Sequence, residues 1–162
     1  MEALYAKMKA AHTVFDATLS ILPRLEAATG PSFGLADPPR AVQWAYDATR
    51  AAHAAGVTIC AGTDGMMLPP SRDSLPALHH EMELLVTRAG FTPLEAITAA
   101  TLNSAMALGA ASKLGTVSPG KLADLLVLDA NPADDIRNTR AIVFVVRGGV
   151  IHRREPPPKT SR

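Results

Sequence analysis

The sequence has 162 residues, the size of one ordinary domain, and 48% of them are hydrophobic, which is enough for a sizeable core. Its net charge of +1, without a basic cluster interleaved with aromatic residues, argues against a nucleic-acid partner. The single cysteine, Cys60, excludes an internal disulfide. No apolar run has the length of a membrane span, and no signal peptide is recognised. We therefore expect the protein to be located in the cytoplasm by default.

Helix-like and strand-like segments alternate in the first half of the chain. Residues 2–11 carry apolar side chains at helical spacing, and residues 13–19 are rich in β-prone side chains. Residues 20–39, with several prolines and glycines, predict a long connection. A helix at 39–55 and a short buried strand at 57–61 follow. This succession indicates an α/β unit.

One carboxylate, Asp64, follows the predicted strand at 57–61, within the turn Gly62-Thr63-Asp64-Gly65. In α/β barrels and open sheets the carboxyl ends of the strands carry the chemistry, and Asp64 lies just past such an end. The two glycines are expected to let the backbone turn sharply around it. Taken alone, this stretch favours a structural role for Asp64, as the cap of a turn, rather than a catalytic role.

The second half changes from helices to a small β unit. The expected elements are a helix at 74–89 capped by Ser74, helices beginning at 92 and 103, a tight turn at 115–121, a strand at 123–128 and a hairpin at 141–152. Cys60, inside the buried strand, is expected to be a packed thiol. Residues 153–162, with three successive prolines, are expected to be disordered.

Several short motifs follow one another in a specific order and spacing. They are Ala61-Gly62-Thr63-Asp64, Leu78-His79-His80-Glu81-Met82-Glu83, Ala89-Gly90-Phe91-Thr92-Pro93, Thr101-Leu102-Asn103-Ser104-Ala105 and Gly115-Thr116-Val117-Ser118-Pro119-Gly120-Lys121-Leu122-Ala123-Asp124. Together they resemble the C-terminal part of the amidohydrolase superfamily, in particular its imidazolonepropionase-like and Xaa-Pro dipeptidase-like branch.

The resemblance implies an α/β fold, namely the C-terminal part of a metal-dependent (β/α)8 TIM-barrel hydrolase with about two barrel strands, followed by helices and a small β unit. The implied boundaries are a partial barrel at 1–112, a segment of a small β domain at 113–152, and the tail at 153–162. The family's His-x-His pair is missing from this sequence. We therefore expect the chain to be a C-terminal fragment that lacks most metal ligands.

The resemblance also implies roles for individual residues. In the family the last barrel strand ends in an aspartate that binds metal and shuttles a proton, and Asp64 matches it. The implied cofactor is a divalent metal, zinc in the complete enzyme, which lowers the pKa of bound water to about 7 while the carboxylate acts as base and then acid. His79 matches a histidine after the last strand, for which substrate contact and packing remain equally open. Asp124 is expected to serve a structural turn.

Two functions remain open at this point. The first is an amidohydrolase-type hydrolase of C–N bonds in a small-molecule amide, cyclic amide or dipeptide, with the isolated chain expected to be inactive. The second is a non-catalytic truncated module, or a subunit that completes a barrel with another chain. The expected partners are thus a small substrate and the missing N-terminal barrel half or a second copy, with neither nucleic acid nor membrane. We also expect the chain alone to be marginally stable, because a strand edge is left exposed.

Overall fold

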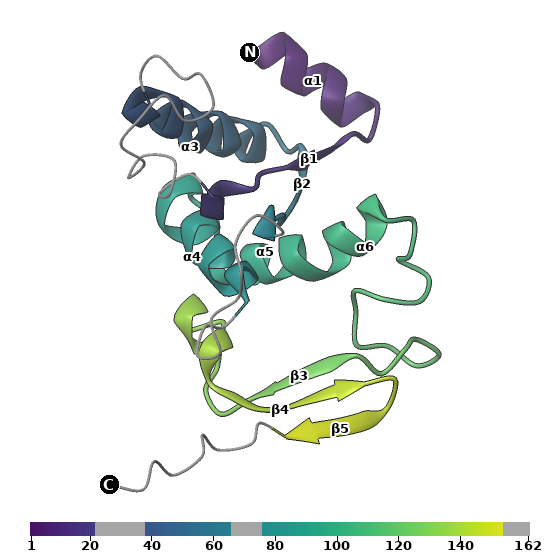
Figure 1. Ribbon diagram of the computed structural model, residues 1–162. Helices are drawn as coiled ribbons and strands as arrows, with labels where there is room; N and C mark the ends of the chain where they lie inside the picture. Colours follow the sequence, from purple (N-terminus) through teal and green to yellow (C-terminus); the bar gives the residue numbers. More distant parts are fainter. Residues whose placement is uncertain (22–37, 66–75, 154–162) are drawn as a thin grey trace, which may run out of the picture.

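The computed structural model describes residues 1–21, 38–65 and 76–153, which form two small sheets and the helices around them. In chain order the elements are α1 (Glu2–Ala10), β1 (Val14–Asp16), the 3-10 turn η1 (Leu19–Ile21), α3 (Pro38–Ala54), β2 (Thr58–Cys60), α4 (Ala77–Ala89), α5 (Pro93–Thr98), the π-helical η4 (Ala99–Asn103), α6 (Ser104–Ala107), β3 (Leu125–Leu128), the 3-10 helix η5 (Ile136–Arg140), β4 (Ile142–Arg147) and β5 (Val150–Arg153). In Figure 1 the N-terminus lies on α1 at one end of the molecule, and the β3-β4-β5 sheet forms the other end.

The first sheet is a parallel pair, β1 and β2, with Phe15 opposite Ile59 and Asp16 opposite Cys60. Phe15 and Ile59 pack in the hydrophobic core, where Ile59 is almost fully buried. The α/β succession predicted for this half is confirmed. The strand predicted at 13–19 is shorter than expected and ends at Asp16, because Thr18 adopts a left-handed backbone and η1 follows it.

Helix α4 contributes most to the core beside this pair. Its buried residues are His79, Glu81, Met82, Leu84, Leu85 and Ala89. The helix ends at Gly90, whose φ of 79° is the left-handed conformation that glycine adopts at helix C-caps. It begins at Ala77 after Pro76, three residues later than the predicted start at Ser74, which lies outside the described residues.

The two helices predicted at 92 and 103 are one continuous helical stretch, α5–η4–α6, with a π-helical segment between the two α-helices. It starts with the expected capping box, in which Thr92 and Glu95 bond each other's backbone N–H. The π segment lies against β2: Ala61 N–H donates to Ala99 O at 3.3 Å, and Asn103 Nδ2 donates to Ile59 O at 2.8 Å. These bonds cover the edge of β2 that faces away from β1.

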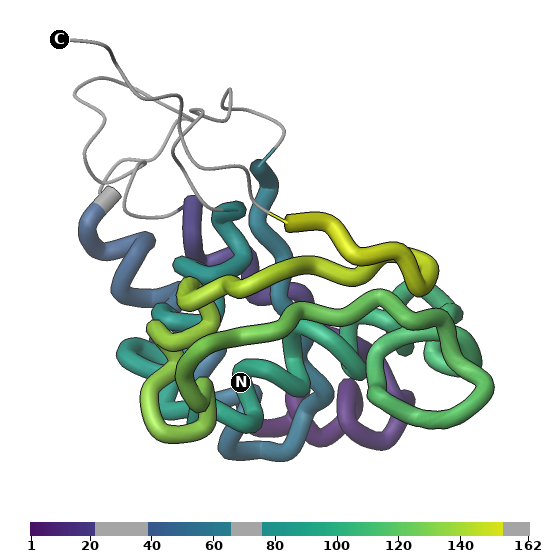
Figure 2. The backbone as a smooth tube through the Cα atoms, turned by 90° about the horizontal axis from the view of Figure 1, so that it is seen from below, coloured from purple at the N-terminus to yellow at the C-terminus, as the bar shows by residue number. Residues whose placement is uncertain are grey.

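The second sheet is antiparallel, in the order β3-β4-β5. The predicted hairpin is confirmed, and Asp124 has the expected structural role, since its Oδ1 accepts a 2.6 Å hydrogen bond from Gly148 N–H in the hairpin turn. Seen from below, this sheet runs across the helices (Figure 2). Arg153, predicted to begin the tail, belongs to β5 instead, and the rest of the predicted tail lies outside the described residues.

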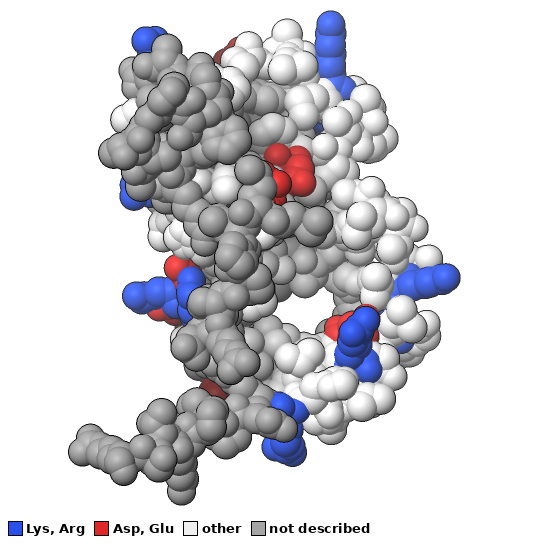
Figure 3. Space-filling view, viewed as in Figure 1, with Lys and Arg blue, Asp and Glu red and all other residues white. Residues whose placement is uncertain are grey.

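The two halves of the molecule meet where η5 packs on α4. In the space-filling view an opening separates the β3-β4-β5 end from the helices above it, and the Lys and Arg side chains seen on this face lie mainly near its outline (Figure 3). Within the described ranges, no helix has the length and apolar character needed to cross a lipid bilayer.

Candidate active site

The carboxyl ends of β1 and β2 lie at the same edge because the two strands are parallel. Asp64 lies just past the end of β2, with an exposed side chain and a φ of 45°. Thr18, just past the end of β1, has a φ of 46°. Left-handed backbone in a residue other than glycine is uncommon and clusters at functional sites, and a β-branched threonine tolerates it less well than aspartate. This edge is therefore the candidate active site.

The turn around Asp64 is made by a different residue from the ones predicted. Gly62 and Gly65 were expected to provide the sharp turn, but neither has a positive φ, and Asp64 itself is the left-handed residue. Aspartate can adopt this conformation because its short polar side chain bonds locally.

Gly62 is needed for space rather than for its backbone freedom. A Cβ added there would stand 2.6 Å from both Asp16 Oδ2 and Thr18 Oγ1, and closer still to Asp16 Oδ1. Thr18 Oγ1 also donates a 2.9 Å hydrogen bond to Asp16 Oδ1. The carboxylate of Asp16, at the end of β1, thus lies directly over Gly62, which follows β2 and precedes Asp64 by two residues.

Asp16 and Cys60 are paired across the sheet and face away from the core side of Phe15 and Ile59, since successive strand residues alternate. Burial raises the pKa of the Cys60 thiol, and the negative charge of Asp16 raises it further. Cys60 is 7% exposed, which confirms the predicted packed thiol. Sequence reasoning assigned no role to Asp16, because a strand predicted through residue 19 hides the fact that Asp16 ends it.

A second carboxylate, Glu81 of α4, is fully buried beneath the turn that follows β1. Its Oε1 accepts the N–H of Leu19 at 2.9 Å, and its Oε2 accepts the N–H of Ser20 at 2.6 Å. Burial raises the pKa of Glu81 to about 7, the two N–H donors oppose this shift, and the charge of Asp16 adds to it. Sequence reasoning also gave Glu81 no role, although a glutamate four residues before Leu85, on the apolar stripe of the helix, was a usable signal.

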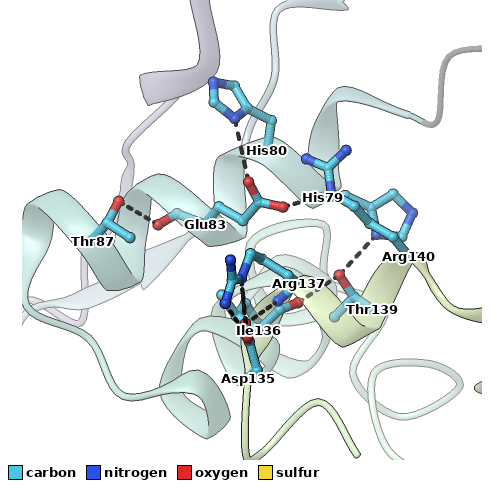
Figure 4. A network of polar contacts seen from close by, with 9 residues as sticks. All are labelled: His79, His80, Glu83, Thr87, Asp135, Ile136, Arg137, Thr139 and Arg140. Carbon is cyan, nitrogen blue, oxygen red and sulfur yellow. Dashed lines mark hydrogen bonds and ion pairs between the residues drawn. The ribbon is translucent and has the colours of Figure 1, made fainter. Parts of the chain in front are cut away.

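His79, for which substrate contact and packing were both open, is buried where α4 meets η5 (Figure 4). Its Nδ1 lies 3.0 Å from Thr139 Oγ1. That hydroxyl donates its own hydrogen to Ile136 O at 2.9 Å, so it accepts from an Nδ1–H of the histidine. Burial lowers the pKa of His79, as does the positive charge of Arg140, while Glu83 raises it.

Arg140 and Glu83 extend the same junction. Arg140 Nε donates to Glu83 Oε1 at 2.5 Å, and His80 Nδ1 lies 3.9 Å from Glu83 Oε2 (Figure 4). These side chains are partly exposed, so their ion pairs contribute little to stability. The network joins α4 to η5, and through η5 to β4.

The candidate metal chemistry depends on Asp64. Its exposed carboxylate fits one oxygen ligand of a divalent ion. Within 1–21, 38–65 and 76–153 no group of three or more His, Cys, Asp or Glu side chains is placed to hold a metal ion. The described residues therefore fit one ligand and not a whole site, since catalytic zinc takes three protein ligands.

Comparisons with known proteins agree with this architecture. The family model of the amidohydrolase family matches residues 32–153. Ochratoxinase from Aspergillus niger is 40% identical over 99 residues, covering 59% of this chain and 19% of that protein. Imidazolonepropionase from Rubrobacter xylanophilus (strain DSM 9941 / JCM 11954 / NBRC 16129 / PRD-1) is 38% identical over 97 residues, covering 60% of this chain and 20% of that protein. The crystal structure of a putative prolidase from Bifidobacterium longum is similar with a TM-score of 0.74 at 35% identity, covering 91% of this chain and 37% of that one.

These comparisons confirm the family resemblance that the motifs indicated. They also confirm the predicted fold class, an α/β part of a TIM-barrel hydrolase with helices and a small β unit. The chain spans about a fifth of the length of the two curated relatives named above, and less than two fifths of the length of the putative prolidase.

Proposed function

This chain belongs to the amidohydrolase family, and from that premise we propose that it supplies part of the active site of a metal-dependent hydrolase of C–N bonds. The substrate class that we propose is a small amide, cyclic amide or dipeptide. One observation carries the proposal: Asp64 presents an exposed carboxylate from a left-handed position just past the carboxyl end of β2. That edge is where barrel enzymes place their catalytic residues.

Asp64 is the proposed proton carrier. When bound, a divalent ion, zinc in this proposal, supplies a Lewis acid that lowers the pKa of water to about 7. The Asp64 carboxylate accepts a proton from the attacking water and then donates it to the leaving nitrogen, so that one group acts first as base and then as acid. The remaining metal ligands would come from outside the described residues.

The proposed division of the chain follows the two sheets. Residues 1–112 would form the part of the barrel that includes β1 and β2, and residues 113–152 would belong to the small β domain. His79 lies at the junction of these parts, where Thr139 occupies its Nδ1. Any contact between His79 and a substrate would therefore be made through Nε2.

The test is turnover by the zinc-loaded, full-length enzyme with and without Asp64→Asn. This substitution keeps the shape and removes both the charge and the proton acceptor, so we expect kcat to fall by about 10²–10⁴-fold. The matched control is Asp134→Asn, an exposed aspartate in the β part of the chain, which should leave kcat unchanged. Near-normal turnover by the Asp64 variant would mean that Asp64 only shapes the turn, and would favour a non-catalytic role for this chain.

A further inference from the structure

We propose that Asp16 is a substrate-recognition residue of the same site, and that its carboxylate binds a cationic nitrogen on a side chain of the substrate, an ammonium or guanidinium group. This proposal rests on the proposed function and adds to it the charge of the substrate. The observation behind it is the seating of the Asp16 carboxylate over Gly62, the glycine two residues before Asp64.

The position of Asp16 in the sheet supports the proposal first. Asp16 is the last residue of β1 and pairs with Cys60, the last residue of β2. Both side chains face away from the side on which Phe15 and Ile59 join the hydrophobic core. The carboxylate therefore lies at the carboxyl edge of the strands and opposite the helix-covered core, where a barrel holds its substrate.

The carboxylate is also held in one orientation. Thr18, in a left-handed conformation that is costly for a β-branched residue, donates its hydroxyl hydrogen to Asp16 Oδ1 at 2.9 Å. The absence of a side chain at Gly62 leaves the space that the carboxylate occupies. Two residues thus fix an exposed acidic group beside the strand of Asp64, and fixed polar groups lose little entropy when a ligand binds.

The charges around Asp16 favour a cation as the ligand. None of the ion pairs between described residues includes Asp16. Its hydroxyl partner Thr18 carries no charge, and the negative charge of Asp16 raises the pKa of two described acidic groups, the Cys60 thiol and the Glu81 carboxyl. A cationic group on the substrate would supply the positive charge that this part of the described chain does not bring to Asp16.

The test compares two dipeptides, lysyl-proline and norleucyl-proline, which have side chains of similar length with and without a positive charge. The assay is kcat/KM of the zinc-loaded, full-length enzyme. We expect the lysine substrate to be preferred by about 10–100-fold, the usual effect of a hydrogen bond to a charged group. Asp16→Asn should bring the ratio close to one through KM, because the contact is made equally in the ground state and the transition state.

Two further variants separate this role from a structural one. Thr18→Val removes the hydroxyl that orients the carboxylate and should lower the preference for lysine by a smaller factor, while Asp134→Asn should leave it unchanged. Turnover of norleucyl-proline by each variant shows that the site is intact. A wild-type enzyme without a preference for lysine, or an Asp16→Asn variant that keeps it or loses both substrates equally, would overturn the proposal. If Asp64→Asn still lowers kcat by about 10²–10⁴-fold in those cases, the proposed function stands without this inference.

Discussion

Glu81 provides the sharpest test of the energetics of this fold. Glu81→Gln retains the size of the side chain and removes its ability to ionise. The native carboxyl is fully buried and its pKa is raised to about 7, against an ordinary value of 4.5. Because the native state holds this proton more tightly than the unfolded state, the contribution of Glu81 to stability depends on pH.

The sign follows from the direction of the shift. Well below pH 4.5 the carboxyl is protonated in both states, and its contribution to stability is fully present. As pH rises from 4.5 to 7, the unfolded state ionises first and is stabilised, so the free energy of unfolding falls, and above pH 7 it is constant. The rise of the pKa of Glu81 from 4.5 to about 7 corresponds to about 3 kcal/mol.

The assay is urea unfolding of wild type and Glu81→Gln at pH 4.5, 6 and 7.5, together with direct titration of the Glu81 carboxyl carbon by NMR. The free energy of unfolding of the wild type, relative to the variant, should fall by about 3 kcal/mol across this range. Asp16→Asn provides a second test, because removing that neighbouring negative charge should lower the pKa of Glu81. A wild-type advantage that is constant with pH, or that grows as pH rises, would refute this reasoning.

Two further predictions concern contacts that join the elements. His79→Phe and Thr139→Val should each destabilise the chain. A double-mutant cycle in urea should give a coupling free energy of about 1 kcal/mol for the hydrogen bond between the two side chains. Additive effects would contradict the junction described for α4 and η5. Asn103→Ala should cost about 1–2 kcal/mol because it leaves Ile59 O without its donor, whereas Asn138→Ala, which removes an exposed loop hydrogen bond, should change the unfolding midpoint little.

Local patterns in the sequence were sufficient for most of the helices and for the hairpin. The apolar spacing of α3 and α4, the capping box of Thr92 and Glu95, and the glycine pair at 148–149 act within a few residues of one another. Asp64 was likewise identified from its place after a buried strand, and its catalytic role remains a prediction. Where several local signals were combined in order, they also indicated the family.

The sequence by itself therefore determined the order of the elements, the α/β character of the first half and the β character of the second. Only the tertiary structure decided which carboxylates matter around the strand ends. Glu81 bonds the backbone of Leu19 across a separation of 62 residues, and Asp16 fills the space left by Gly62, which follows the neighbouring strand. Neither relationship has a local signature, because each joins residues that become neighbours only when β1, β2 and α4 pack together.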